Sequence, residues 1–191
     1  NNGYDGTFSS IAQIIIDTTP AGVPSPLTQT PTNNKQPTWN WSAVVDAAAY
    51  EILLDGVSMQ ETTQLSYTAP ELDHGPHVIK VRSRDADGNV SEYGKQDIFV
   101  DRQPPLKPVL VTAADLTSNK RPTWSWNVSA DVSEYGVIFD NNTEITQTTI
   151  SYTPSELSDG AYKIKVRAKD AVGNWSDYAE STVVVDITPP D

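Results

Sequence analysis

The chain of 191 residues carries 25 acidic and 13 basic side chains, which give a net charge of −12 at pH 7. Such a charge argues against nucleic acids and anionic membranes as partners, because both require clustered lysine and arginine. The absence of cysteine excludes disulfides, zinc–thiolate sites and thiol catalysis, and the lack of any apolar run of about 18 residues argues against membrane insertion.

The first predicted element is a single strand at the end of residues 1–17. Residues 10–17 match residues 94–101, the last strand of the module that follows, with one residue of slippage. The tryptophans and earlier strands of that module have no counterpart here. We therefore predict that residues 1–17 are the C-terminal strand of a truncated preceding repeat. This orphan strand is expected to pair with a neighbouring chain or to lie against the next domain.

Residues 18–103 are predicted to form the first of two copies of one module. Short segments alternate apolar and polar residues between turn-forming Gly, Pro, Asn and Asp, which is typical of half-buried strands. The strands predicted in this first copy span residues 37–41, 50–54, 63–67, 77–84 and 97–100.

Residues 104–191 form the second copy, which repeats the first at an offset of 85. Trp39 and Trp41 recur as Trp124 and Trp126, and a unit that recurs with its tryptophans in place is a folded module copied in tandem. Seven short strands in such a unit indicate an antiparallel sandwich. The predicted fold is therefore all-β, with two tandem seven-stranded antiparallel β-sandwiches plus the N-terminal orphan strand. The strands predicted in the second copy span residues 109–111, 123–126, 135–139, 142–145, 148–152, 162–168 and 181–185.

Proline-containing segments separate the modules. They are Asp17-Thr-Thr-Pro20, Asp101-Arg-Gln-Pro-Pro105 and Asp186-Ile-Thr-Pro-Pro190. Adjacent prolines remove backbone donors and fix φ, so strand pairing stops there, and they stiffen the linker. The predicted domain boundaries therefore follow residues 17 and 103.

Both copies carry the same set of motifs. The second has Pro122-Thr-Trp-Ser-Trp126, Asp159-Gly-Ala-Tyr162 and Asp170-Ala-Val-Gly-Asn-Trp-Ser176, and the first has Pro37-Thr-Trp-Asn-Trp41 and Val100-Asp-Arg-Gln-Pro-Pro105. They resemble the tandem bacterial immunoglobulin-like, fibronectin type III-like repeats of large surface adhesins. This resemblance implies a bacterial extracellular or cell-surface location, with neighbouring repeats of the same chain as partners. His77 departs from the pattern, because it replaces Tyr162, which resembles the corner tyrosine of such sandwiches, so the first copy is expected to secure this corner differently.

Catalysis has no support in the sequence. The only histidines, His74 and His77, lie in one turn of one copy, where the other copy has Asp159 and Tyr162. No Ser-His-Asp order, P-loop or dinucleotide fingerprint is present. We predict a protein that is not an enzyme.

Aromatic side chains allow two interpretations, a sugar-stacking platform or a core. Alternation places both indoles of each tryptophan strand on its apolar side, which favours the core. Trp175 differs, because it stands beside a Gly-Asn turn where the first copy has Val90. It is the best candidate for an exposed aromatic that contacts a domain or a sugar.

Two interpretations are also open for residues 85–89 and 170–174: calcium loops, or tight turns in which Asp caps its own backbone. The preceding repeat should end at the same pole of the sandwich. Asp101 is then expected near Asp131, Asp170 and Asn174, and Asp17 near Asp46, Asp85 and Asp87. An interdomain calcium ion is the one cofactor considered, and the aspartates predicted to bind it are Asp17, Asp85, Asp87, Asp101 and Asp170.

The predicted function is that of an extender or stalk in an exported bacterial surface protein or adhesin, which spaces a distal binding region from the cell. One alternative is a ligand-binding module for a glycan or a protein. Another is a spacer in a secreted carbohydrate-active enzyme. A binder should show an aromatic cluster in only one copy, and Trp175 is the one hint of this.

Overall fold

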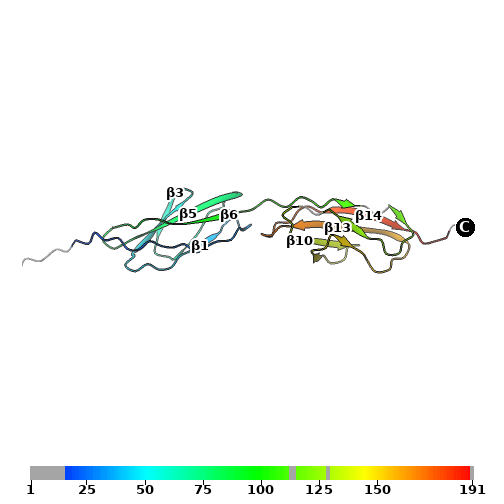
Figure 1. Ribbon diagram of the computed structural model, residues 1–191, viewed down its shortest axis with the longest axis horizontal. Coiled ribbons are helices and arrows are strands. Elements are labelled where there is room, and N and C mark those ends of the chain that lie inside the picture. The colour runs from blue at the N-terminus through cyan, green and yellow to red at the C-terminus, as the bar shows by residue number, and fades with distance from the viewer. Residues whose placement is uncertain (1–15, 112–114, 128–129, 190–191) are drawn as a thin grey trace, which may run out of the picture. The chain divides into compact units, whose positions relative to one another are not determined.

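The structure is a computed structural model that describes residues 16–111, 115–127 and 130–189. Every regular element in these ranges is a β-strand (Figure 1), so the predicted all-β class is confirmed. None of the described residues belongs to a helix long and apolar enough to cross a membrane. The predicted orphan strand falls largely within residues 1–15 and so lies outside the described residues.

The first copy contains six described strands, and the second contains eight. Those of the first are β1 (Thr38–Asn40), β2 (Ala49–Leu54), β3 (Val57–Thr62), β4 (Ser66–Thr68), β5 (Gly75–Arg84) and β6 (Gly94–Val100). Those of the second are β7 (Leu110–Val111), β8 (Leu116–Thr117), β9 (Trp124–Trp126), β10 (Glu134–Phe139), β11 (Ile145–Gln147), β12 (Ser151–Tyr152), β13 (Gly160–Lys169) and β14 (Ala179–Val185).

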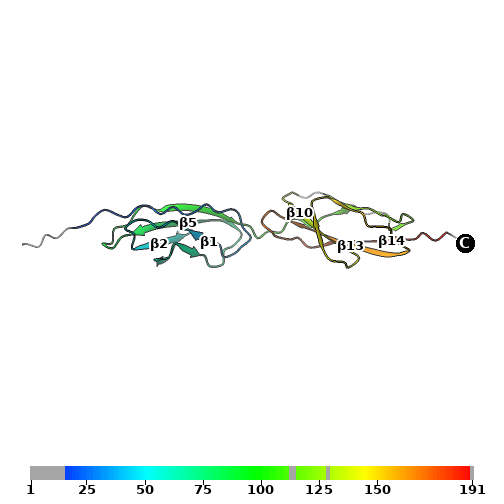
Figure 2. The ribbon, with the colours of Figure 1, turned by 90° about the horizontal axis from the view of Figure 1, so that it is seen from below.

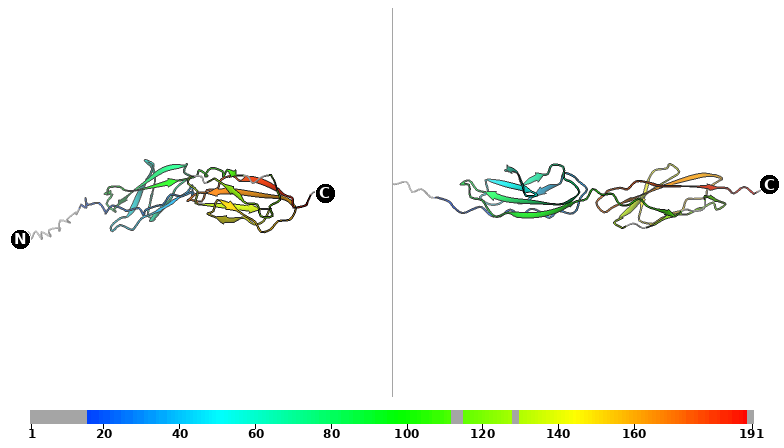
Figure 3. Two further views of the ribbon diagram at one scale, coloured as in Figure 1. Left: turned by 45° about the vertical axis from the view of Figure 1, so that its right-hand side comes forward. Right: turned by 90° about the horizontal axis from the view of Figure 1, so that it is seen from above.

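Both copies build their larger sheet in the same order. In the first copy the order is β3-β2-β5-β6, and in the second it is β11-β10-β13-β14-β8. Figure 2 labels β2 and β5 of the first sheet and β10, β13 and β14 of the second. Ile52 lies opposite Val81 in the first sheet, and Val137 lies opposite Val166 in the second, so the register repeats at the offset of 85. β13 and β14, drawn in orange and red, are antiparallel neighbours (Figure 3).

The copies differ in the segment that leads into the tryptophan strand. In the second copy this segment contributes β7 to one sheet and β8 to the other, where β8 runs parallel to β14. In the first copy it makes only isolated bridges, from Pro26 to Trp41 and from Thr32 to Val100. Four prolines within residues 20–31 remove donors that a ladder would need. The sequence predicted seven strands in each copy, and this segment is one source of the difference.

The chain divides into two compact units. The first compact unit contains residues 16–28, 38–67 and 78–97, and the second compact unit contains residues 29–37, 68–77 and those described from 98 onward. The domain boundaries predicted after residues 17 and 103 stay predictions.

The tryptophan pairs lie in the core, as the alternation predicted. Trp39, Trp41, Trp124 and Trp126 expose 0%, 3%, 0% and 1% of their surface. Trp41 meets Tyr50 edge to face at a centroid distance of 5.6 Å, and the equivalent pair in the second copy is separated by 5.5 Å. Because their rings are buried, the sugar-platform interpretation of these four tryptophans is wrong.

Candidate functional site

The acidic loops predicted at the poles are residues 85–89, after β5, and residues 170–174, after β13. Each begins with a buried aspartate, and Asp85 and Asp170 expose only 6% and 7% of their surface. The backbone N–H of each donates at 3.0 Å to the carbonyl of the asparagine four residues later. Gly88 has a φ of 92°, and its counterpart in the second loop has 102°, a region that glycine adopts readily. The predicted tight turn is confirmed in both loops.

Each loop aspartate caps its own backbone. Asp85 Oδ1 accepts the N–H of Asp87 at 3.0 Å and of Asn89 at 2.8 Å, and Asp85 Oδ2 accepts from Asn89 Nδ2 at 2.9 Å. The side-chain hydrogen bond from Asn89 is the main cause that holds the pKa of Asp85 below its usual value, and backbone N–H groups add to it. A carboxylate bonded in this way stabilises its loop most when it is ionised.

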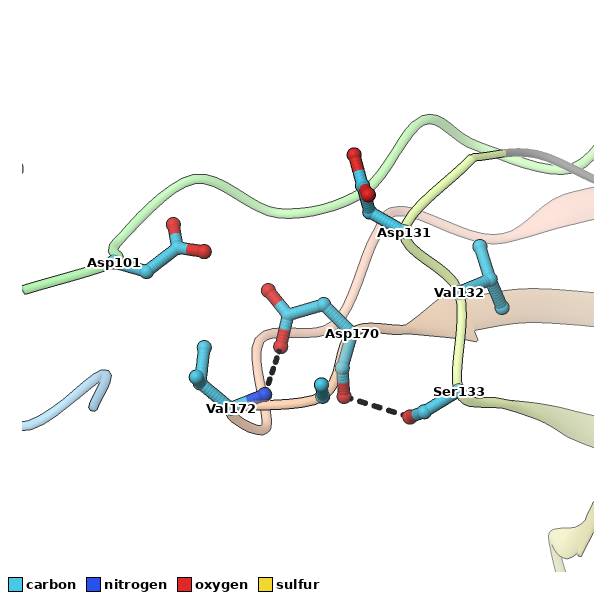
Figure 4. A pocket seen from close by; sticks show the side chains of 7 residues that line it. Asp101, Asp131, Val132, Ser133, Asp170 and Val172 are labelled. Carbon is cyan, nitrogen blue, oxygen red and sulfur yellow. Dashed lines mark hydrogen bonds between the residues drawn. The ribbon is translucent and has the colours of Figure 1, made fainter. Parts of the chain in front are cut away.

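Two cavities are lined by aspartates that the sequence analysis predicted to lie close together. Asp101, Asp131 and Asp170 line one of about 340 Å³ in the second compact unit. Figure 4 shows these three side chains on separate segments, with the Asp170 carboxylate accepting from Val172 N and the Asp170 carbonyl accepting from Ser133 Oγ. The equivalent cavity in the first compact unit, about 440 Å³, is lined by Asp17, Asp46, Asp85 and Asp87 together with Ala47, Ala48 and Ala86.

The arrangement of donors tests whether these residues suit calcium. Asp170 Oδ1 already accepts three backbone N–H bonds, and Asp170 Oδ2 accepts from Asn174 Nδ2 at 2.8 Å. Across the described ranges, no three His, Asp or Glu side chains converge closely enough to hold a metal ion. The loop carboxylates as arranged therefore serve the turn. Calcium binding by Asp17, Asp85, Asp87, Asp101 and Asp170 stays a prediction, and it requires these side chains to move.

Calcium, if it binds, should raise the melting temperature of the chain. An ion that binds only the folded state adds about 2.7 kcal/mol of stability at a hundredfold excess over its Kd. Differential scanning calorimetry in calcium and then in chelator measures this shift, which Asp101→Ala should reduce. Identical melts in calcium and chelator, for the wild type and the variant alike, would remove calcium from the account.

A hydrogen bond at the sandwich corner is shared by the two copies despite the His77 departure. Tyr162 Oη donates to the Ser158 carbonyl at 3.2 Å. His77 Nε2 lies 2.9 Å from the carbonyl of Asp73, the residue equivalent to Ser158. The first copy therefore differs, as expected, in the side chain that secures this corner, which is a histidine and not a tyrosine. The backbone carbonyl that this side chain contacts is at the same position in both copies.

Trp175 is half-buried and covered by cations, so it is less available than the sequence suggested. The Arg167 guanidinium carbon lies 4.1 Å from its ring centroid and Lys169 Nζ lies 5.1 Å from it. Glu144 holds Arg167 through two hydrogen bonds of 2.7 and 2.5 Å, and it accepts from Tyr178 Oη at 2.9 Å. Sequence reasoning missed Glu144, whose role depends on this packing.

The two copies bind the equivalent arginine with different glutamates, and this difference explains why only the second copy has a tryptophan at position 175. In the first copy, Arg82 binds Glu51 of the neighbouring strand at 2.9 and 2.6 Å. The position equivalent to Glu51 is Gly136, where a Cβ atom would lie 2.2 Å from Glu144 Oε1 and 3.1 Å from Trp175 Cζ3. Gly136 thus admits both the replacement carboxylate and the indole. The difference between Glu51 and Gly136 is the feature of the sequence from which this change of arginine partner could have been inferred.

The Glu144–Arg167 pair predicts a loss of stability in acid. The hydrogen bond from Arg167, assisted by that from Tyr178, lowers the pKa of Glu144 from the ordinary value of 4.5. A carboxyl group whose pKa falls on folding adds stability above its unfolded pKa, and this stability is lost as the pH drops through the folded pKa. Glu144→Gln should therefore destabilise the chain most at neutral pH, and the difference from wild type should shrink below about pH 4.5.

Urea unfolding from pH 7 down to pH 3 checks this expectation. The exposed Glu156 provides the matched control, Glu156→Gln. A gap between Glu144→Gln and wild type that stays constant over the whole range would contradict the ion-pair account.

Comparison with known proteins supports the module class. Residues 111–187 match the family model described as bacterial Ig-like domain. The chain is similar to the fibronectin(III)-like modules of Clostridium thermocellum CbhA, at 13% identity over 83% of this chain and 89% of that one, with a TM-score of 0.45. It is also similar to the chicken CNTN1 FN1-FN3 domains, at 15% identity over 86% and 68% of the chains and a TM-score of 0.45. A search of curated proteins finds no match.

The match to the bacterial Ig-like family model confirms the predicted resemblance to bacterial immunoglobulin-like repeats for residues 111–187. The family match lies within the second copy and includes β8 to β14 and the loop at residues 170–174. Such modules are typically non-catalytic and are consistent with an extracellular location.

Proposed function

We propose that the chain is a non-enzymatic spacer of an exported bacterial surface protein or adhesin, and that it holds a distal binding region away from the cell. The observation that supports this is the structural use of the repeated residues. The tryptophan pairs fill the core, and Asp85 and Asp170 close their loops. A module whose repeated residues maintain its own structure suits a tandem array, in which each unit contacts only its neighbours.

A ligand-binding module for a glycan or a protein is the second candidate, and Trp175 is the observation that favours it. Its ring is half-buried, and the first copy has valine there. A sugar that stacks on this indole must compete with Arg167 and Lys169. A third candidate is a spacer in a secreted carbohydrate-active enzyme. The chain would again act as a spacer, but next to a catalytic domain and not next to an adhesive one.

Binding assays on the purified chain separate spacer from binder. Glycan arrays and immobilised extracellular proteins should give no saturable signal, and Trp175→Ala should behave as the wild type does. Saturable binding of one glycan or protein, lost in Trp175→Ala under conditions in which the variant stays folded, would replace the spacer with a binding module.

A further inference from the structure

The peptide group between Asp101 and Arg102 has both polar atoms bound by side chains that are distant in sequence. Asn174 Nδ2 donates to the Asp101 carbonyl at 3.0 Å, and His74 Nδ1 accepts the Arg102 N–H at 3.1 Å. All of these residues belong to the second compact unit. One peptide plane is therefore held from two directions, by its oxygen and by its nitrogen.

The side-chain amide of Asn174 has one orientation that satisfies its surroundings. One of its N–H groups points to Asp170 Oδ2 at 2.8 Å and the other to the Asp101 carbonyl, with the Gln103 carbonyl at 3.4 Å. Rotating the amide would turn its own oxygen toward a carboxylate and a carbonyl, which are all acceptors. Asp170 therefore positions Asn174, and Asn174 holds the linker.

Each half of this arrangement recurs at an equivalent position. Asn89 Nδ2 donates to the Asp17 carbonyl at 3.1 Å and to Asp85 Oδ2 at 2.9 Å. Asp159, the counterpart of His74, accepts the N–H of Ile187 at 2.7 Å. Because both contacts appear twice, they belong to the module and not to one linker sequence.

The backbone donors of the linker are fully used. The Arg102 N–H goes to His74, and the Gln103 N–H goes to Asp101 Oδ1 at 3.0 Å. Pro104 and Pro105 have no N–H to offer. Every backbone donor from residue 102 to residue 105 is thus bonded to a side chain or absent, as in a segment with one defined conformation.

We propose that Asn174 and His74 form a peptide clamp, which fixes the linker at residues 101–103 without a metal ion. The clamp deepens the spacer function proposed above and rests on it for its use, because a spacer needs linkers of defined conformation. Asn174 and His74 act as positioning residues in this proposal, which gives neither of them a ligand to bind.

Amide hydrogen exchange of the full chain in chelator, followed by NMR, tests the clamp. Asn174→Asp turns a donor into an acceptor at nearly constant shape, and His74→Ala removes the other half while leaving residues 170–174 intact. Each should accelerate exchange of the Arg102 N–H about tenfold, the effect of losing one net hydrogen bond. The exposed Asn127 supplies the control Asn127→Asp, with the same change in charge and no expected acceleration.

Two results would overturn the clamp. One is an Arg102 exchange rate that is the same in His74→Ala, Asn174→Asp and the Asn127→Asp control. The other is a wild-type Arg102 N–H that is protected in calcium and unprotected in chelator, which would assign the linker to a metal. If Asn174→Asp also accelerates the amides of β13, His74→Ala decides, since it should accelerate the Arg102 amide and leave the amides of β13 unchanged. A glycan ligand would contradict the spacer and leave these rates unchanged, so the two proposals fail separately.

Discussion

Replacing Trp126 by alanine is expected to destabilise the second copy by about 3–5 kcal/mol, which is the usual cost of truncating a buried aromatic side chain. Trp126 exposes 1% of its surface on β9 and meets Tyr135 edge to face at 5.5 Å. Its loss removes apolar contacts and leaves a cavity beside Val137, Ile164 and Val166 in the same cluster. Urea unfolding followed by circular dichroism measures the change.

Two variants calibrate this result. Trp126→Phe should cost less, because the phenyl ring keeps part of the packing and the indole N–H finds no acceptor within the described part of the chain. Trp175→Ala removes the same atoms from a half-buried position and should cost less than Trp126→Ala. If Trp126→Ala and Trp175→Ala unfold with equal free energies, the assignment of Trp126 to the core is wrong.

Replacing Asp170 by alanine is expected to destabilise the second copy by about 2–4 kcal/mol, because it leaves three half-buried backbone donors unpaired, and a fully buried unpaired donor costs about 1–3 kcal/mol. The backbone N–H groups of Val172, Gly173 and Asn174 donate to Asp170 Oδ1 at 3.0, 2.7 and 2.8 Å. Alanine offers none of them an acceptor. Urea unfolding in chelator measures the loss without any contribution from metal ions.

Asp131 provides the matched control for this loop. It lines the same cavity, is exposed, and has a φ of 63° that asparagine tolerates. Asp131→Asn should therefore change the stability by no more than about 0.5 kcal/mol. Equal effects of the two substitutions, seen only when calcium is present, would show that the aspartates act together as metal ligands and that the capping account is wrong.

The sequence predicts the strands whose alternation is strict. Residues 162–168 and 135–139 fall within β13 (Gly160–Lys169) and β10 (Glu134–Phe139), because apolar side chains occupy one face of each. It fails for β3, Val57–Thr62, which is an exposed edge strand with little apolar periodicity. The strand predicted at residues 109–111 corresponds to β7, whereas β8 was not predicted. β8 pairs with β14 in the other sheet, and a local pattern carries no information about such a partner.

The candidate site also has features that could be predicted from the sequence and features that could not. The offset of 85 and the sandwich topology were enough to place Asp101 with Asp131 and Asp170 around one cavity. The direction of the Asn174 amide was not accessible, because it depends on the rotamers of two side chains and on a carbonyl 73 residues away. Glu144 was missed for a similar reason, since it replaces Glu51 of β2 from a position directly before β11.

The spacer function is tested most directly by displaying the chain on a bacterial surface, between a membrane anchor and a small epitope. Antibody access to the epitope, measured by flow cytometry on cells with a thick surface polysaccharide, reports how far the chain carries it. We predict that the epitope is shielded on the anchor alone and accessible on the chain, and that the displayed chain confers no adhesion of its own. Equal access with and without the chain, or adhesion that the chain confers without a distal domain, would contradict the spacer.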